Sequence, residues 1–535
     1  MAAYAPSDLD LFTRFVCFGS EDGSYNVLAQ PEFTDRAPSL GSFLCKEKGA
    51  EAISRIRKVF LNKSYITKDP LLYALATIIR KTPVTDKHEE DEVRTTAYAL
   101  AEEICVSPMD LFTFVHYDKA VADNKKAGWG RGMRRLVTKW YESKAPLKLA
   151  SEVTKCKSGR GWTHRDLIRQ THIKADKVSK GTSLVIKYLI QHSKQIENPE
   201  DDLEPVVTFL NDLNSLTSSN SSEGALVRSL IEKHKLVDRQ IPSFLLQMPE
   251  TYEGLLGHIK LEDVIRSIPK MASLRMLDYA APQTAQVVDV VKNVDRILQE
   301  KIHPMVIFRS LRRYESDRTK KWVKNIHLIK ALQAAMITSM QNLETIGKRT
   351  LLAVHIDSKI AKQHVIGSSY LSPIMPCTLM TKFLLESEEK LHVIFFQQKV
   401  FEIPFTRRVS MTGIVEKFLD ATKEPGNATY NISEPLKWAA QSKKAFDNIL
   451  VITDKKVVTT GQDFHAAVRN YRSEMALPST KVVLIGLGDL TAVTNKNDMN
   501  MLEISGFNET VPPLVYNFFL GKFDYPSYEV KVEAP

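Results

Sequence analysis

Hydrophobic residues recur at helical spacing through the first two thirds of the chain. Between residues 71 and 79 they follow the i, i+1, i+4, i+7, i+8 pattern of one helix face: Leu71, Leu72, Leu75, Ile78 and Ile79. Similar stripes, separated at short intervals by Gly or Pro, continue to about residue 345. Many short amphipathic helices in succession predict helix pairs stacked as a solenoid of HEAT-like repeats.

Two polar stretches interrupt this helical pattern. The tract Asn214–Gly224 (NSLTSSNSSEG) is too polar to pack, so it predicts a loop within the array. The acidic stretch Asn198–Glu204 predicts a solvated connection between helices.

The pattern changes near Gly347, where short apolar runs begin to alternate with helical stretches. The apolar runs are Leu351–Ile356, Leu391–Phe396, Ile449–Ile452 and Val482–Ile485, and the helical stretches lie near 377–387, 411–421, 434–446 and 462–473. Continuous apolar strands alternating with helices are typical of a parallel sheet covered on both faces. The sequence therefore predicts a helical domain over residues 8–345 and one doubly wound α/β domain over residues 346–535.

Composition narrows the class of protein and its compartment. Hydrophobic residues make up 43% of the 535 positions and charged residues 25%, which is ordinary for a folded protein. The five cysteines are scattered without a C-x-x-C pair, which argues against a zinc site and a disulfide framework. The N-terminus lacks the pattern of a signal peptide, and no apolar run approaches the roughly 20 residues of a membrane span. We expect a cytoplasmic protein, with the nucleus as a second compartment and no membrane contact.

Charge is concentrated in one segment. Residues 117–174 hold fifteen Lys or Arg and five acidic residues, so this segment carries the net charge of +10 of the whole chain. Aromatic and imidazole groups are interleaved with these cations. A basic surface with stacking groups and hydrogen-bond donors suits RNA. The candidate RNA-binding residues are Lys125, Lys126, Arg131, Arg134, Arg135, Lys139, Lys155, Lys157, Arg160, Arg165, Arg169, His172 and Lys174.

The same residues also have an ordinary interpretation as a solvated helix face, the usual fate of a charge run. The spacings Arg131/Arg135 and Arg135/Lys139 place like charges on one helix face, which costs a few tenths of a kcal/mol per pair unless an anion compensates. Trp129 and Trp140 could stack on bases, but Trp is more often a core residue, and we expect both in the core.

Several motifs, in order along the chain, resemble the Ro ribonucleoprotein family, whose members carry a TROVE module. They are Phe15–Tyr25, Trp129–Arg131 with Trp140–Tyr141, Val153–Lys157, Gly161–Asp166 with Thr171–His172, Ile302–Pro304, Lys330–Ala335, Gly347–Arg349, and Leu502 with Gly506–Phe507. The resemblance covers residues 15–507 and identifies the chain as a divergent member.

The resemblance implies a ring of HEAT-like helical repeats closed by a von Willebrand factor A-like domain. In that family the outer basic surface binds small Y RNAs, and the central hole admits single-stranded 3′ ends of misfolded noncoding RNA. The family's Y RNA contacts carry over onto Lys155 and His172. The family commonly has Arg where this chain has Gly159, and the neighbouring Arg160 could substitute for it.

Von Willebrand A-like domains often hold a divalent cation through an Asp-x-Ser-x-Ser loop after the first strand. Here the corresponding residues are His355, Asp357 and Lys359, so one carboxylate stands beside a competing cation. Thr429 and Asp454 match the second-loop and third-loop positions. The sequence predicts a degenerate site, without a cofactor and with Mg²⁺ disfavoured.

These features predict a monomeric protein, not an enzyme, that binds small structured noncoding RNA and single-stranded RNA ends in RNA quality control, as part of a ribonucleoprotein. One alternative is a helical-repeat adaptor whose α/β domain binds a protein partner, with RNA incidental. Another is a metal-dependent nuclease, which would require a carboxylate cluster that the sequence does not offer.

Overall fold

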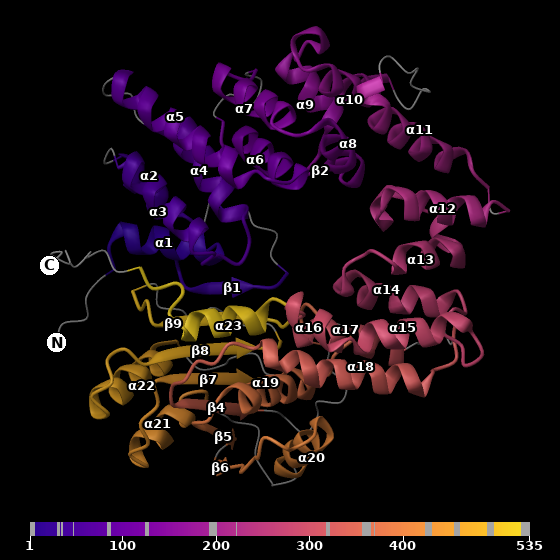
Figure 1. Cartoon of the computed structure of the whole chain (residues 1–535). Coiled ribbons are helices and arrows are strands. Elements are labelled where there is room, and N and C mark those ends of the chain that lie inside the picture. Colours follow the sequence, from indigo (N-terminus) through magenta and orange to yellow (C-terminus); the bar gives the residue numbers. More distant parts are fainter. Residues whose placement is uncertain are drawn as a thin grey trace, which may run out of the picture.

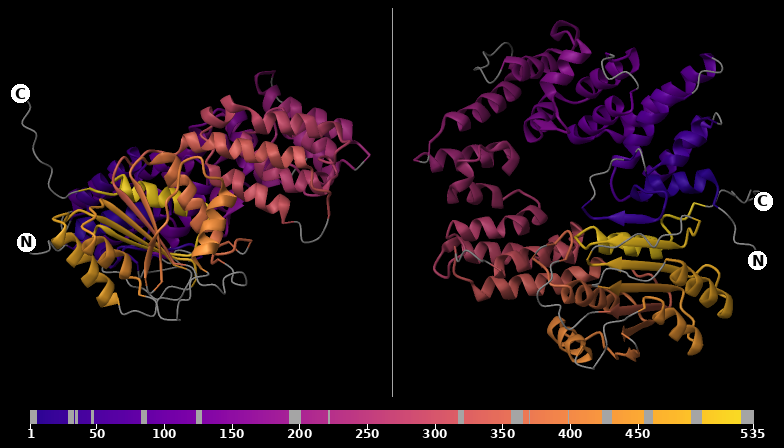
Figure 2. Two further views of the ribbon diagram at one scale, coloured as in Figure 1. Left: turned by 90° about the horizontal axis from the view of Figure 1, so that it is seen from below. Right: turned by 180° about the vertical axis from the view of Figure 1, so that it is seen from behind.

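Helices and one sheet form a closed circuit in the computed structural model of the chain (Figure 1). The structure describes residues 6–28, 33, 36–45, 48–82, 87–122, 128–191, 201–220, 222–316, 321–355, 365–368, 370–397, 399–422, 431–453, 461–488 and 497–525. The first eighteen α-helices follow a curved path that leaves the α/β domain and returns to it, as the view from behind also shows (Figure 2). This circuit is the ring that the resemblance implies.

The helices of the circuit are short, as the Gly and Pro spacing predicts. They are α1 (Asp8–Phe18), α2 (Pro38–Cys45), α3 (Gly49–Leu61), α4 (Asp69–Lys81), α5 (Lys87–Ile104), α6 (Pro108–Ala120), α7 (Arg131–Glu142), α8 (Pro146–Lys155), α9 (His164–Thr171), α10 (Lys180–Gln191), α11 (Glu204–Ser218), α12 (Gly224–His234), α13 (Pro249–Leu256), α14 (Leu261–Ser273), α15 (Pro282–Lys292), α16 (Val294–Gln299), α17 (Pro304–Glu315) and α18 (Ile326–Ser339). A 3₁₀ turn, η5 (Met340–Asn342), follows α18.

The apolar stripes form the interior of this array. All five apolar residues predicted on one face between 71 and 79 are buried in α4, which packs against α5 and α6. The predicted loop at Asn214–Gly224 is wrong for residues 214–218, because α11 continues to Ser218. Leu213 and Leu216 are buried in its last turns. Burial of these leucines stabilises helical backbone that the polar residues between them disfavour.

The α/β domain is built as predicted, with additional strands at both edges. Its strands are β4 (Thr350–His355), β5 (Leu391–Phe396), β6 (Val400–Glu402), β7 (Asn448–Thr453), β8 (Lys481–Gly486) and β9 (Met501–Ser505), and its helices are α19 (Ile374–Ser387), α20 (Met411–Ala421), α21 (Glu434–Gln441), α22 (Gly461–Glu474) and α23 (Val511–Phe519). The strand order is β1-β9-β8-β7-β4-β5-β6, parallel except for the pairing of β5 with β6.

Alternate residues of β4 face two separate cores. Leu351 and Ala353 pack with residues of α21 and α22, whereas Leu352 and Val354 join a cluster that includes α19 and α23. This second cluster is continuous with the core of the helical circuit. The period of two along a strand therefore separates a face that the domain covers by itself from a face that joins it to the ring.

One strand comes from the other end of the chain. β1 (Ser24–Asn26) pairs in parallel with β9 and becomes the edge strand of the sheet. β4 starts at Thr350, four residues after the boundary expected at residue 346, and residues 24–26 lie in the sheet although they belong in sequence to the helical domain.

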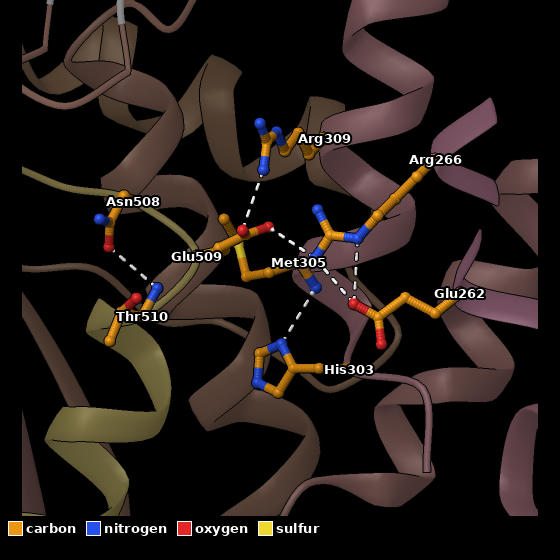
Figure 3. Close-up of polar contacts among 8 residues, drawn as sticks. All are labelled: Glu262, Arg266, His303, Met305, Arg309, Asn508, Glu509 and Thr510. Carbon is orange, nitrogen blue, oxygen red and sulfur yellow. Dashed lines mark hydrogen bonds and ion pairs between the residues drawn. The ribbon is translucent and has the colours of Figure 1, made fainter. Parts of the chain in front are cut away.

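A second contact, drawn in Figure 3, attaches the other end of the helical path to the α/β domain. Glu509, between β9 and α23, accepts a hydrogen bond from Arg309 of α17 at 2.9 Å and pairs with Arg266 of α14 at 3.4 Å. Arg266 also pairs with Glu262. Both ends of the helical path are thus attached to the α/β domain. Within the described residues, no helix is long and apolar enough to cross a membrane.

Candidate nucleic-acid interface

The basic segment folds into three helices and a small hairpin. The hairpin joins β2 (Ser158–Gly159) to β3 (Trp162–Thr163) and separates α8 from α9. Helix α7 packs against α5 and α9. These elements lie on the far side of the ring from the sheet (Figure 1).

Helix α7 divides its residues sharply between core and solvent. Its buried positions are Met133, Leu136, Val137, Trp140 and Tyr141. Its exposed positions include Arg131, Arg134 and Arg135. Lys139 is also exposed and pairs with Glu102 of α5 at 2.5 Å. The structure therefore presents three predicted arginines together and neutralises the lysine beside them.

The aromatic residues of this segment serve mainly as core. Trp129 and Trp140 are buried, which confirms the prediction that both belong to the core. The Trp140 indole N–H donates to the Cys105 carbonyl at 2.9 Å, so its polar atom is also satisfied. Trp162 is half-buried, and the Lys119 ammonium lies 5.3 Å from its ring centroid.

A buried histidine holds the hairpin to the helices. His164 Nε2 lies 2.9 Å from the Cys156 carbonyl, and its Nδ1 lies 2.7 Å from the Tyr141 hydroxyl. A carbonyl only accepts, so Nε2 carries the proton and Nδ1 accepts from Tyr141. Burial lowers the pKa of His164 to about 4 and raises that of Tyr141 well above its usual value. His164 is therefore a neutral structural residue, and not a cation for phosphate.

The packing of the β2–β3 hairpin explains why this chain has Gly159 where the family commonly has Arg. Arg160 and Gly161 both have positive φ, 51° and 80°, as a two-residue type I′ turn requires. A Cβ added at Gly159 would lie 2.7 Å from Met109 Sδ and 3.1 Å from Phe112 Cδ2. Position 159 therefore faces α6 closely, and a long side chain there would have to displace Met109.

Arg160 is engaged within the protein. Its guanidinium pairs with the carboxylate of Asp69 at the start of α4, and the same carboxylate accepts a hydrogen bond from the Tyr117 hydroxyl at 3.0 Å. This contact ties the hairpin to the first turn of α4. Arg160 therefore stabilises the fold. Sequence spacing did not reveal this role, because Asp69 lies far away along the chain.

The other predicted cations lie at the ends of α8 and α9. Lys155 is half-buried in the last turn of α8, and Lys157 is exposed just after it. Arg169, His172 and Lys174 are exposed around the end of α9, whereas Arg165 is half-buried and has a polar interaction. Lys125 and Lys126 lie outside the described residues.

His172 closes α9 in a left-handed conformation, with φ of 56°. Because α9 starts at His164, the rise of about 1.5 Å per residue separates His164 and His172 by roughly 12 Å along the helix axis. Arg169, His172 and Lys174 thus form a cationic group at the C-terminal end of α9.

The comparisons with known proteins agree with this architecture. Residues 14–234 match the TROVE domain family and residues 349–519 match the Ro60 vWA domain family. The chain belongs to the Ro60 family of TROVE-domain proteins. It is 25% identical to the RNA-binding protein RO60 of Caenorhabditis elegans, over 96% of this chain and 88% of that protein.

Two bacterial comparisons extend across the whole length of this Ro60 family member. It is 22% identical to the RNA-binding protein RO60 of Deinococcus radiodurans, over 97% of this chain and 94% of that protein. The crystal structure of the Deinococcus radiodurans RO (RSR) protein superposes with a TM-score of 0.82 at 21% identity, covering 96% of this chain and all of that one. The helical ring with its α/β domain is therefore the fold of this structure too.

The strand ends of the α/β domain carry the remaining candidates. His355, the last residue of β4, is buried, its Nδ1 lies 3.3 Å from the Thr453 hydroxyl, and its ring packs on Phe396. An imidazole held in this way does not match the carboxylate that a hard cation prefers. Asp357, Lys359, Thr429 and Asp454 lie outside the described residues. Among the residues that are described, no group of three His, Cys, Asp or Glu could hold a metal ion.

Proposed function

We propose that this protein binds small structured noncoding RNA on the surface formed by α7, the end of α8, the β2–β3 hairpin and α9. The observation that carries the proposal is the exposure of Arg134, Arg135, Lys157, Arg169 and His172 on elements whose interior is fixed by the neutral His164. Phosphates attract such cations without regard to sequence, and a rigid framework lowers the ordering cost of binding. The names of the two relatives as RNA-binding proteins support the same function.

The same proposal includes a mode of action. The protein acts by binding RNA and not by catalysing a reaction. It is a monomeric component of a ribonucleoprotein and takes part in RNA quality control. Its main compartment is the cytoplasm, with the nucleus as a second one. Its Y RNA-like ligand contacts Lys155 and His172, and single-stranded 3′ ends enter the centre of the ring. The α/β domain, which joins both ends of the helical path, is the part that would receive a protein partner.

The test of the structured-RNA surface is a double substitution. Lys155→Ala with His172→Ala should weaken binding of a Y-like hairpin RNA about tenfold, because two phosphate or base contacts of roughly 0.5–1 kcal/mol each are lost. The exposed pair Lys390→Gln with Lys399→Gln, in the α/β domain, removes at least as much positive charge and serves as the control. Wild-type affinity of the first variant would contradict the proposed surface.

Salt dependence separates RNA binding from the adaptor alternative. A polyphosphate contact predicts a steep linear fall of log K with log salt, measured by filter binding. An adaptor with incidental RNA affinity predicts a shallow fall and tighter binding to a protein partner.

For single-stranded ends, a hairpin with a free 3′ tail should bind better than the same hairpin with a blunt end, and equal affinities at physiological salt would count against entry into the ring.

We also propose that the α/β domain works without bound Mg²⁺. His355 stands at the end of β4 in a buried contact with Thr453, and Lys359 is a cation four positions further along the sequence. Magnesium should then leave the melting temperature unchanged, since a ligand stabilises only through occupancy of the native state. Stoichiometric uptake of Mg²⁺ in calorimetry would refute this proposal.

A further inference from the structure

A second cationic surface lies far from the first, at the connection between α17 and α18. Helix α17 starts where His303 meets Phe383 of α19, and α18 ends where η5 contacts α19. The described part of their connection, residues 321–325, therefore lies at the opposite end of both helices, away from the α/β domain (Figure 2). The described residues between 309 and 330 include six Lys or Arg and one acidic residue.

The cations of this surface are available. Lys321 and Lys324 are exposed, and within the described part of the chain neither forms a salt bridge. By contrast Arg309 and Arg312 are paired, with Glu509 and Glu315 respectively. Lys321 and Lys324 thus present uncompensated charge just before the first turn of α18, and Arg313 and Lys330 are exposed on the two helices that flank them.

Aromatic rings stand beside these lysines. Tyr279 is 55% exposed. Its hydroxyl donates to the Lys324 carbonyl at 3.2 Å and accepts from the Ile326 amide at 3.1 Å, and its ring lies 6.1 Å from that of His327. Because the hydroxyl is used within the protein, what Tyr279 offers to solvent is its ring.

A third ring stiffens the connection. Trp322 stacks on Tyr314 with 8° between the ring planes, and its indole N–H donates to the Tyr314 carbonyl at 3.2 Å. The Asn325 amide N–H donates to the Tyr314 hydroxyl at 2.9 Å, and the Asn325 side chain donates to Leu277. Trp322 and Asn325 are therefore held in place, so they lose little conformational entropy when a ligand binds.

We propose that Tyr279, Trp322 and His327, with Lys321 and Lys324, form a second RNA-binding surface that stacks unpaired bases of single-stranded RNA. Aromatic faces with adjacent cations are what a strand with exposed bases needs, since each base offers a π-face and each nucleotide a charge. An acidic protein would match the lysines but would leave the exposed rings without their best partner. This inference rests on the proposed function and extends it to a site on the opposite arm of the ring.

The test uses the full chain and two probes: a circular uridine oligomer of about ten nucleotides carrying 4-thiouridine, which has no 3′ end to enter the ring, and the Y-like hairpin. Irradiation should crosslink the oligomer to Tyr279, Trp322 or His327. Lys321→Gln with Lys324→Gln should weaken oligomer binding about tenfold and lower its salt slope by about 1.4, because each single-strand contact contributes about 0.7. Hairpin binding should not change, nor should Lys390→Gln with Lys399→Gln affect the oligomer.

Two substitutions at Tyr279 separate stacking from a structural role. Tyr279→Ala should weaken oligomer binding as strongly as the lysine pair, whereas Tyr279→Phe, which loses only the hydroxyl, should retain it. Equal losses in both would show that the hydroxyl anchor is what matters and would overturn the stacking role. The lysine pair keeps the test valid where Tyr279→Ala fails to fold.

The remaining outcomes distinguish failure of the proposed function from failure of the single-strand surface alone. A wild-type chain that binds neither probe overturns the proposed function and this surface with it. Normal hairpin binding, with oligomer affinity unchanged in both the lysine and the Tyr279→Ala variants, overturns this surface alone. Displacement of the oligomer by polyglutamate as effectively as by unlabelled oligomer would assign the surface to an acidic protein partner instead, and would also overturn it.

Discussion

At the scale of single residues, the basic segment contains side chains that have a partner inside the protein and side chains that are exposed to solvent. Composition does not distinguish between them. His164 and Arg160 stand among the cations in sequence, yet one is a buried neutral hydrogen-bonding group and the other is paired with Asp69. His172 has the same side chain as His164 but is exposed at the end of α9. The chemical role of each group follows from whether a partner from another element reaches it.

The first prediction concerns the protonation of His164. Burial lowers its pKa in the folded protein to about 4, below the value of about 6.5 in an unfolded chain. The unfolded state therefore takes up a proton first, so this residue's contribution to stability is complete above pH 6.5 and is lost as the pH falls toward 4. The loss approaches about 1.4 kcal/mol per pH unit in that interval.

Nuclear magnetic resonance of the imidazole carbons should find His164 neutral at pH 5.5, with the proton on Nε2. In His164→Phe the dependence of unfolding free energy on pH over this interval should be shallower. A His164 that titrates near pH 6.5 in the folded protein would contradict the hydrogen-bond assignment.

At the scale of secondary-structure elements, α7 combines a packed face with an electrostatically unfavourable one. Arg131 and Arg135 are one turn apart on its exposed side, and Lys139 follows one turn later with Glu102 opposite. Such spacing weakens the helix in isolation. An RNA ligand would compensate the repulsion, so stability and binding make opposite demands on the same residue.

The second prediction tests whether Arg135 lowers the stability of α7 while it contributes to RNA binding. Arg135→Gln should raise the unfolding free energy by a few tenths of a kcal/mol, because it relieves like-charge repulsion along α7. The same change should weaken hairpin RNA binding and lower the salt slope by about 0.9, because one phosphate contact is lost. The measurements are denaturant unfolding and filter binding at graded salt. Lost stability together with unchanged affinity would mean that Arg135 faces no ligand.

The third prediction concerns the β2–β3 hairpin. Gly159→Ala should destabilise the protein by about 1 kcal/mol, because the new methyl group meets Met109 Sδ at 2.7 Å and the flexible thioether must move. Gly128→Ala is the matched control, since Gly128 also lies outside a helix and a Cβ there meets nothing within 4 Å. Met109→Ala should reverse part of the loss in a double mutant, as thermal unfolding can measure. A Gly159→Ala variant as stable as Gly128→Ala would contradict the close contact.

At the scale of the whole molecule, two contacts of different character close the ring. Near the N-terminus, β1 extends the sheet, and the buried Arg14 donates to the carbonyls of Glu21 at 3.3 Å and Asp498 at 2.6 Å. On the other side the half-exposed ion pairs of Glu509 with Arg266 and Arg309 hold α14 and α17 (Figure 3). Buried and fully bonded groups contribute more than solvated ion pairs.

The fourth prediction compares these two contacts. Arg14→Gln should destabilise the protein by about 3 kcal/mol, because it removes a buried cation from carbonyls that lose their donors. Glu509→Gln should cost only about 1 kcal/mol, because its partners are partly solvated and salt screens them. Urea unfolding at low and high salt measures both, and the Glu509→Gln effect should shrink at high salt. Equal costs would mean that the two contacts are of the same kind.

Local sequence determined the elements themselves. The stripe in α4 and the continuous apolar run of β4 were sufficient to predict both, because a helix repeats every 3.6 residues and a parallel strand is buried on both faces. The motif matches then predicted the ring and the α/β domain. The last turns of α11, the short strands β1, β6 and β9 and the parallel pairing of β1 were not predicted, since burial supplied by remote residues stabilises them.

Tertiary structure decided which candidate residues have partners. Arg160 meets Asp69, ninety-one positions away, and the exposed Tyr279 stands beside Lys324, forty-five positions away. No spacing rule brings such pairs together, because their contact depends on how the helices pack. The sequence thus determined where the positive charge is concentrated and which elements carry it. Only the packed ring decided which of these charges are neutralised within the protein and which remain for RNA, because an ion pair needs both groups at one place in space.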